Sequence, residues 1–160
     1  MSDTADFSIE GWDEFVQNFA SFVDKWEEKK AVLLKRMGNI YHEEVIPHVP
    51  VDTSRLVDNI FVFGEGIPQD YVEVGTNVHY ALYVNDGHVQ HKRFLPAERL
   101  SAGGKSKYLK QGAKGIMLSE RYVAGKFFVE KGMNGAKPRL ETLINSFMEQ
   151  CKREVEGGKL

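Results

Sequence analysis

The sequence predicts an α+β fold, in which an antiparallel sheet of about four strands packs against a long N-terminal helix and a C-terminal helix. Between Pro50 and Gly87, short apolar segments alternate with turn-forming residues, which is typical of strands. On either side, segments 12–45 and 138–155 repeat apolar residues at helical spacing and could cover the sheet. A chain of 160 residues is about the size of one domain with its own core, so residues 1–160 are expected to form a single domain.

The N-terminal helix is expected to begin near Trp12, after a polar segment, 1–10, that is expected to be disordered. Acidic residues stand in its first turn, where the helix dipole favours them, and Pro47 ends it. The apolar stripe of this helix has two possible roles. It could pack on the sheet, or, because so long a helix extends beyond strands of ~20 Å, part of it could form a subunit interface. Lys29 and Lys30 interrupt that stripe, which consists of Phe15, Phe19, Phe22, Trp26, Leu33, Met37 and Ile40.

Three strands are predicted in the central stretch. The first, 56–63, has apolar residues on both faces and should therefore lie between two layers. The second ends at the turn Gly75-Thr76-Asn77, and the third, 79–84, ends at Asn85-Asp86-Gly87. An antiparallel meander is the simplest arrangement of the three.

The C-terminal part is predicted to add one strand and one helix. Segment 121–130 has the composition of a fourth strand, with Gly125 at a bulge or bend. The last helix is expected to begin at Pro138, a residue suited to a first helical position, and to end at Gly157-Gly158.

Residues 88–115 are expected to form a long, flexible and basic loop, because glycines interrupt any regular pattern and Glu98 is its one acid. Its cations could meet the phosphates of a nucleic acid or an acidic protein surface, or could simply be solvated. The candidate contact residues are Lys92, Arg93, Arg99, Lys105, Lys107, Lys110 and Lys114.

Signals of catalysis and of cofactor binding are weak. Gly104-Lys105-Ser106 is similar to the end of a phosphate-binding loop, but Arg99 occupies the place of the required first glycine. The residues His79, Asp86, His88 and His91 are of types that bind zinc, yet no helix fixes the geometry of the last two. We therefore expect a protein that is not an enzyme and has no catalytic residue, cofactor or metal.

The location of the protein is predicted from three negative signals. No apolar run approaches the ~18 residues that a membrane helix needs, and the acidic start of the chain differs from a signal peptide. Cys151 is the single cysteine and lies in a helical apolar pattern, which favours a small core residue over a catalytic thiol. These features indicate a cytoplasmic origin with no membrane partner.

The central stretch resembles a known family. The segments PVDTSRLVDNI and VEVGTNVHYALYVNDG are similar to the pattern of the head-tail joining, or tail-completion, neck proteins of long-tailed bacteriophages and prophages. Two departures are Ser54, where glycine is usual, and Asn85-Asp86-Gly87-His88, where Glu-x-Gly-Thr is more frequent. Ser54 can still serve at its position if its φ is negative, so it weakens only the claim of a special backbone conformation there. The motif residues that would form the scaffold are Pro50, Asp52, Thr53, Arg55, Leu56, Gly75, Thr76, Asn77, Tyr80, Ala81, Tyr83 and Gly87.

The resemblance implies a structural assembly protein with no catalytic role. It further implies that the protein acts as a ring, commonly hexameric, between the portal end of the head and the tail tube. The implied partners are further copies of the chain, phage connector and tail-tube proteins, and DNA within the channel. The implied location is the neck or tail end of the virion, and the host cytoplasm during assembly. The alternative function is a nucleic-acid-binding module that uses the basic loop 92–114.

Overall fold

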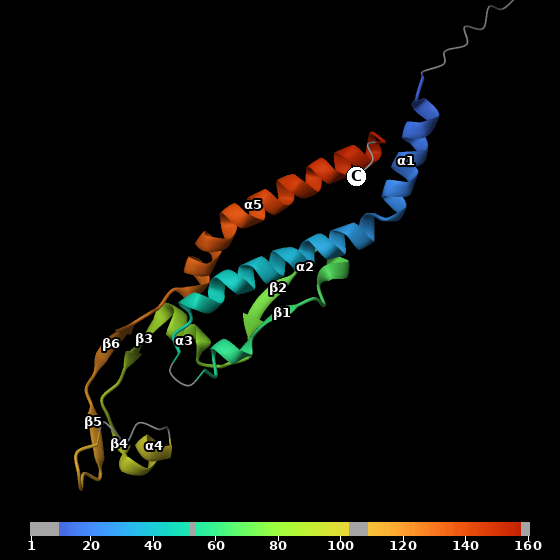
Figure 1. The fold of residues 1–160 in the computed structure, drawn as a ribbon. Helices are drawn as coiled ribbons and strands as arrows, with labels where there is room; N and C mark the ends of the chain where they lie inside the picture. The colour runs from blue at the N-terminus through green and yellow to red at the C-terminus, as the bar shows by residue number, and fades with distance from the viewer. Residues whose placement is uncertain (1–9, 52–53, 103–108, 158–160) are drawn as a thin grey trace, which may run out of the picture. The chain divides into compact units, whose positions relative to one another are not determined.

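A computed structural model describes residues 10–51, 54–102 and 109–157, and the α+β fold class is confirmed. The chain divides into two compact units, which we describe separately. One, the helical unit, comprises residues 1–77 and 128–160; the other, the central unit, comprises residues 78–127. The described residues contain three two-stranded antiparallel sheets instead of one sheet of about four strands. Figure 1 shows the order of the elements along the chain.

The expected N-terminal helix is interrupted once. Helix α1 (Trp12–Asp24) and helix α2 (Trp26–Val45) meet at Lys25, whose φ of −96° and ψ of 0° leave the helical region. The sequence pattern therefore gave the extent of the helical segment correctly and its continuity wrongly. Helix α2 leads into the short 3₁₀ helix η1 (Ile46–His48), where Pro47 stops the α-helical hydrogen bonding as predicted.

Helix α2 lies between two partners in the helical unit (Figure 1). On one side it packs on the antiparallel pair of β1 (Ile60–Phe63) and β2 (Glu73–Thr76), which η2 (Val57–Asn59) precedes and η3 (Ile67–Gln69) connects. Gly38 makes this approach close, because a Cβ there would lie 2.7 Å from a methyl of Val62. In β1, Ile60 is buried whereas Phe61 and Phe63 are 44% and 37% exposed. The expectation that both faces of this strand are covered is therefore wrong within the described helical unit.

Helix α5 (Phe128–Val155) packs along the other side of α2 and begins ten residues before the predicted start. Pro138 lies inside this helix instead of at its first position, and the hydroxyl of Thr142 donates to its carbonyl oxygen at 3.0 Å. The preceding residues include Gly132 and Gly135, which have low helix propensity. Close packing of Gly132 and of Ala136, which is 0% exposed, favours the helix there despite the composition.

In the central unit, a helix replaces the predicted third strand. Helix α3 (Ala81–Asp86) buries Ala81 and Asn85, which are four residues apart, and the amide of Val84 donates to the carbonyl of Tyr80 at 3.1 Å. Over six residues, alternation and helical spacing are hard to distinguish, and the tertiary contacts of these two positions favour the helix. The expected three-strand meander is accordingly wrong.

The residues expected as a flexible loop, 88–115, contain regular structure. Strand β3 (Gly87–Gln90) pairs with β6 (Arg121–Ala124), and β4 (Arg93–Pro96) pairs with β5 (Gly115–Leu118). Both pairs share one register, since Gly87 is opposite Ala124 and Pro96 is opposite Gly115, so segments 87–96 and 115–124 form one interrupted ribbon. Helix α4 (Ala97–Ala102) follows the ribbon. Strand β6 also ends at Ala124, well before the predicted end of the fourth strand.

Candidate functional site

An uncovered apolar face on α1 is the first candidate surface. Gly11 begins the helix with φ of +83°, and none of the residues of α1 is buried. Trp12, Phe15 and Phe19 form a row of rings with centroids 5.9 and 6.2 Å apart. We call the exposed set the α1 stripe: Trp12, Phe15, Val16, Phe19 and Val23, with 41–55% of each side chain exposed. Such a contiguous patch is typical of a protein interface.

The stripe lies beside the side of α1 that packs on its neighbours. Helix α1 contacts α5, and its half-buried residues Asn18 and Phe22 are four residues apart on one side of the helix. Phe22 follows Phe15 by seven residues, so this packed side adjoins one edge of the stripe. Phe22 contacts Trp26 with ring centroids 5.6 Å apart, and Trp26 in turn contacts Phe147 of α5 at 6.2 Å. This aromatic chain fixes α1 within the helical unit and leaves the stripe free.

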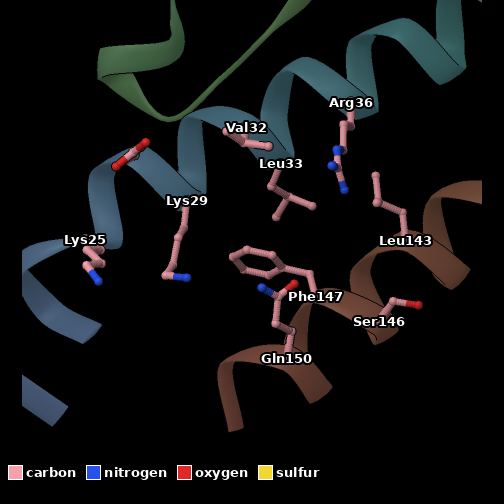
Figure 2. A pocket seen from close by; sticks show the side chains of 10 residues that line it. Lys25, Lys29, Val32, Leu33, Arg36, Leu143, Ser146, Phe147 and Gln150 are labelled. Carbon is pink, nitrogen blue, oxygen red and sulfur yellow. The ribbon is translucent and has the colours of Figure 1, made fainter. Parts of the chain in front are cut away.

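A groove of about 300 Å³ lies between α2 and α5 (Figure 2). Leu33, Leu143 and Phe147 form its apolar floor, and Lys25, Lys29 and Arg36 bring cationic groups to it. Its remaining lining residues are Glu28, Val32, Ser146 and Gln150. The lining contains no histidine or cysteine, so the groove offers shape and positive charge to a side chain and no evident set of catalytic groups.

Ion pairs explain the two lysines that interrupt the helical stripe. Lys29 donates to Glu154 of α5 at 2.7 Å and 2.8 Å, and Gln150 donates to the same carboxylate at 3.0 Å. Lys30 turns to the other side of α2, where it pairs with Asp70 and with Glu27. The hydrogen bond from Lys29 is the main reason that the pKa of Glu154 is lowered. These lysines therefore tie α2 to both of its neighbours.

Further groups in the helical unit have perturbed pKa values through packing. The guanidinium of Arg139 donates to Glu44 at 2.7 Å and to Glu43 at 2.8 Å, which raises its pKa. Burial, followed by the charge of Glu154, raises the pKa of the Cys151 thiol. A raised thiol pKa is opposite to what a nucleophilic cysteine needs.

The motif residues lie in both units, so the structure does not gather them into one site. Leu56 is buried in the helical unit, Pro50 is half-buried and Arg55 is exposed; the half-buried residues Gly75 and Thr76 belong to β2, which Asn77 follows. Asp52 and Thr53 lie outside the described residues. In the central unit, Ala81 is buried, Tyr80 is half-buried and Tyr83 is 57% exposed.

Backbone geometry explains two positions of the motif. Ser54 has a φ of +58°, so the condition of a negative φ is not met and this serine adopts the left-handed conformation that glycine accepts most easily. Gly87 has φ of +87° and ψ of 174°, and a Cβ there would lie 2.6 Å from the carbonyl oxygen of Val123. Gly87 thus permits the exit from α3 into the ribbon.

The basic residues and histidines of the central unit are exposed wherever the structure describes them. Arg93 lies on β4 and Arg99 on α4, Lys92 lies between β3 and β4, and Lys110 and Lys114 precede β5; Lys105 and Lys107 lie outside the described residues. Among the described residues, no three histidine, cysteine or acidic side chains gather in a way that could hold a metal. His79 packs its ring against Tyr80, and His88 packs against Tyr83.

Sequence reasoning missed the apolar pairs of the ribbon. Val89 is opposite Tyr122 and Phe94 is opposite Met117, and 52–64% of each of these side chains is exposed. Segments 87–96 and 115–124 show no regular alternation of apolar and polar residues, so their local sequence gave no signal for these pairs. No helix within the described ranges is long and apolar enough to cross a membrane.

Comparison with known proteins relates the chain to a protein family and to a bacterial protein. Residues 13–87 match the family model described as "Bacteriophage HK97-gp10, putative tail-component". The "Uncharacterized protein YqbI" of Bacillus subtilis (strain 168) is 32% identical over 150 residues, covering 78% of this chain and 85% of that protein. No solved structure gives a significant match.

Proposed function

Because the chain belongs to the HK97-gp10-like family of bacteriophage tail components, we propose that it forms a closed ring at the head-tail junction of a tailed phage or prophage. Family membership makes it a structural tail component and a virion protein. In the proposed role, its partners are connector proteins on the head side and tail-tube proteins on the other side. DNA would pass through the ring, and assembly would occur in the host cytoplasm.

The observation that supports assembly is the α1 stripe. Five large apolar side chains remain 41–55% exposed on one short helix, and burial of apolar surface stabilises an association by roughly 25 cal/mol per Å². None of the described large side chains is fully buried, so the core is thin. A tail component that assembles through this stripe would cover surface that the subunit leaves exposed.

A closed ring also requires a second, different surface on each subunit. In a head-to-tail contact, one patch of a subunit meets another patch of the next subunit, and a suitable rotation closes the ring. The described residues offer further exposed apolar groups for this purpose on β1 and on the ribbon. The fold thus has enough unlike surfaces for a ring.

The ring can be tested with a charge placed on the stripe. In the purified wild-type protein, electron microscopy and sedimentation velocity should reveal rings with a central channel. Phe19→Glu should raise the concentration needed for half-assembly by roughly tenfold or more, because a charge would be buried in the contact. Gln17→Glu adds the same charge to another exposed position of α1 and should retain wild-type assembly.

Two results would contradict the proposal. Wild-type protein that stays monomeric at high concentration would argue against a ring, and so would normal assembly of Phe19→Glu. The position in the virion needs its own measurement, namely mass spectrometry and labelled microscopy of intact particles. Particles that lack the protein at the junction would argue against the neck location.

A further inference from the structure

The central unit has a charge opposite to that of the helical unit. Residues 78–127 contain nine lysines and arginines against three acids, a net charge of +6. The remaining residues, 1–77 and 128–160, contain twelve lysines and arginines against twenty acids, a net charge of −8. The overall charge of −2 conceals this separation. Opposite charges on two surfaces favour their association and suppress wrong pairings.

The ribbon combines positive charge with exposed apolar groups. Its cross-strand pairs Val89 with Tyr122 and Phe94 with Met117 are exposed. Because side chains alternate along a strand and the register is continuous, the two pairs lie on opposite faces of the ribbon. Arg93 shares the face of Val89, and Lys92 and Arg121 share the face of Phe94, so each face combines an apolar pair with a cation. Each sheet of the ribbon, β3 with β6 and β4 with β5, has two strands. An isolated two-stranded ribbon is only marginally stable in water. The ribbon therefore has both the composition of an interface and a reason to need a partner.

Helix α1 has the complementary composition. It contains Asp13, Glu14 and Asp24 and no lysine or arginine, and Glu27 and Glu28 follow in the first turn of α2. Asp13 and Asp24 lie next to residues of the α1 stripe, whose large side chains are exposed, whereas Glu14 lies near Gly157. An acidic, aromatic helix and a basic, apolar ribbon match in charge and in apolar character.

We propose that the ribbon of one copy of the chain docks on the α1 stripe of a second copy. The inference rests on the proposed ring and specifies its head-to-tail contact. Each copy would use its ribbon to contact one neighbour and its α1 stripe to contact the other, as a closed ring requires. The apolar pairs favour a protein partner over nucleic acid, since phosphates would engage the cations and leave Val89 and Met117 exposed.

A charge-swap experiment tests the contact. Arg93→Glu with Arg121→Glu reverses one cation on each strand of the ribbon, and Asp13→Lys with Asp24→Lys reverses two acids of α1. Each double variant should raise the concentration for half-assembly by roughly tenfold or more, because like charges would face each other. In an equimolar mixture of the two variants, the reversed, acidic ribbon of one variant can meet the reversed, basic α1 of the other. A chain with all four substitutions has this reversed charge pairing at every interface and should recover most of the wild-type assembly.

The control and a second measurement keep the result decisive. Lys137→Glu with Lys152→Glu makes the same change in net charge as the ribbon variant, on exposed positions of α5, and should leave assembly unaffected. A photo-crosslinker at position 122, in a mixture of light and isotopically heavy chains, should link to peptides from segment 12–25 of the other copy. Links to other segments alone would overturn the proposal.

The outcomes separate this contact from the ring itself. If wild-type protein stays monomeric, the proposed ring fails and this inference fails with it. If the wild type forms rings and the ribbon variant assembles equally well, the ring stands and the ribbon contact is overturned. If that variant assembles normally but loses low-salt retention of a short DNA duplex, the ribbon contacts DNA instead of a second copy.

Discussion

Gly132 of α5 lies directly against Val45 of α2, so that a Cβ at position 132 would overlap the valine side chain and lie 2.8 Å from its Cα. Val45 is 3% exposed, and Ala136, one turn after Gly132, is 0% exposed. These small residues let the two long helices approach at the point where η1 leaves α2. The helical unit depends on this contact.

Gly132→Ala should therefore lower the free energy of unfolding by about 1–3 kcal/mol, since overpacking outweighs the higher helix propensity of alanine. Gly135→Ala is the matched change, because its nearest neighbour is the movable carboxylate of Glu44. That variant should be close to neutral or slightly stabilising. Urea denaturation followed by circular dichroism measures both, and equal effects would contradict the packing argument.

Gly87→Ala should destabilise the central unit by about 3 kcal/mol, from backbone strain together with overlap with Val123. Gly112→Ala is the control, because Gly112 also has positive φ (+77°) but has open space around it. It should cost only about 1 kcal/mol. Amide hydrogen exchange at Val89 and Tyr122 reports on the ribbon, and unchanged protection in Gly87→Ala would argue against this role.

Ser54→Gly should raise the free energy of unfolding by up to about 1 kcal/mol, because glycine tolerates the φ of +58° without the strain that a side chain brings. The same substitution at Ser21, inside α1, should cost about 1 kcal/mol. Thermal unfolding compares the two. A loss of stability in Ser54→Gly would contradict the left-handed conformation.

Glu154→Gln should reduce stability at neutral pH by about 0.5–1 kcal/mol, because it removes the charge that Lys29 contacts. Folding lowers the pKa of Glu154, so the ion pair stabilises the protein above the ordinary glutamate value of 4.5. This contribution is lost as the pH falls through the lowered value. The difference from wild type should thus shrink in acid, as urea titrations between neutral and low pH would measure. Glu149→Gln, an exposed change on the same helix, is the control.

The thiol of Cys151 should react slowly with iodoacetamide in the folded protein at pH 8, because burial and the charge of Glu154 raise its pKa. Urea should accelerate the reaction, and so should Glu154→Gln, which removes the nearby anion. Mass spectrometry of quenched samples gives the rates. Equal rates in native and unfolded protein would show that the thiol is not protected.

Part of the candidate surface was predictable from sequence. Phe15 and Phe19 belong to the predicted stripe, and the stripe's use in a subunit contact was one of the two interpretations that its length allowed. The ribbon was not predicted, because glycines and lysines in 88–115 resemble a loop when the pairing of Phe94 with Met117 is unknown. Pairing between segments separated in sequence leaves little local signal.

The sequence by itself determined the α+β class, the extent of the two helical regions and the family to which the chain belongs, because apolar periodicity and the motif around Gly75 are local features. Only the tertiary structure decided that α5 begins at Phe128, since Gly132 and Pro138 oppose a helix, and the close packing of Gly132 against Val45 outweighs this local preference. It likewise decided that 81–86 is a helix and that the ribbon has one continuous register. At these positions long-range contacts outweigh local propensity, and sequence pattern alone does not reveal such contacts.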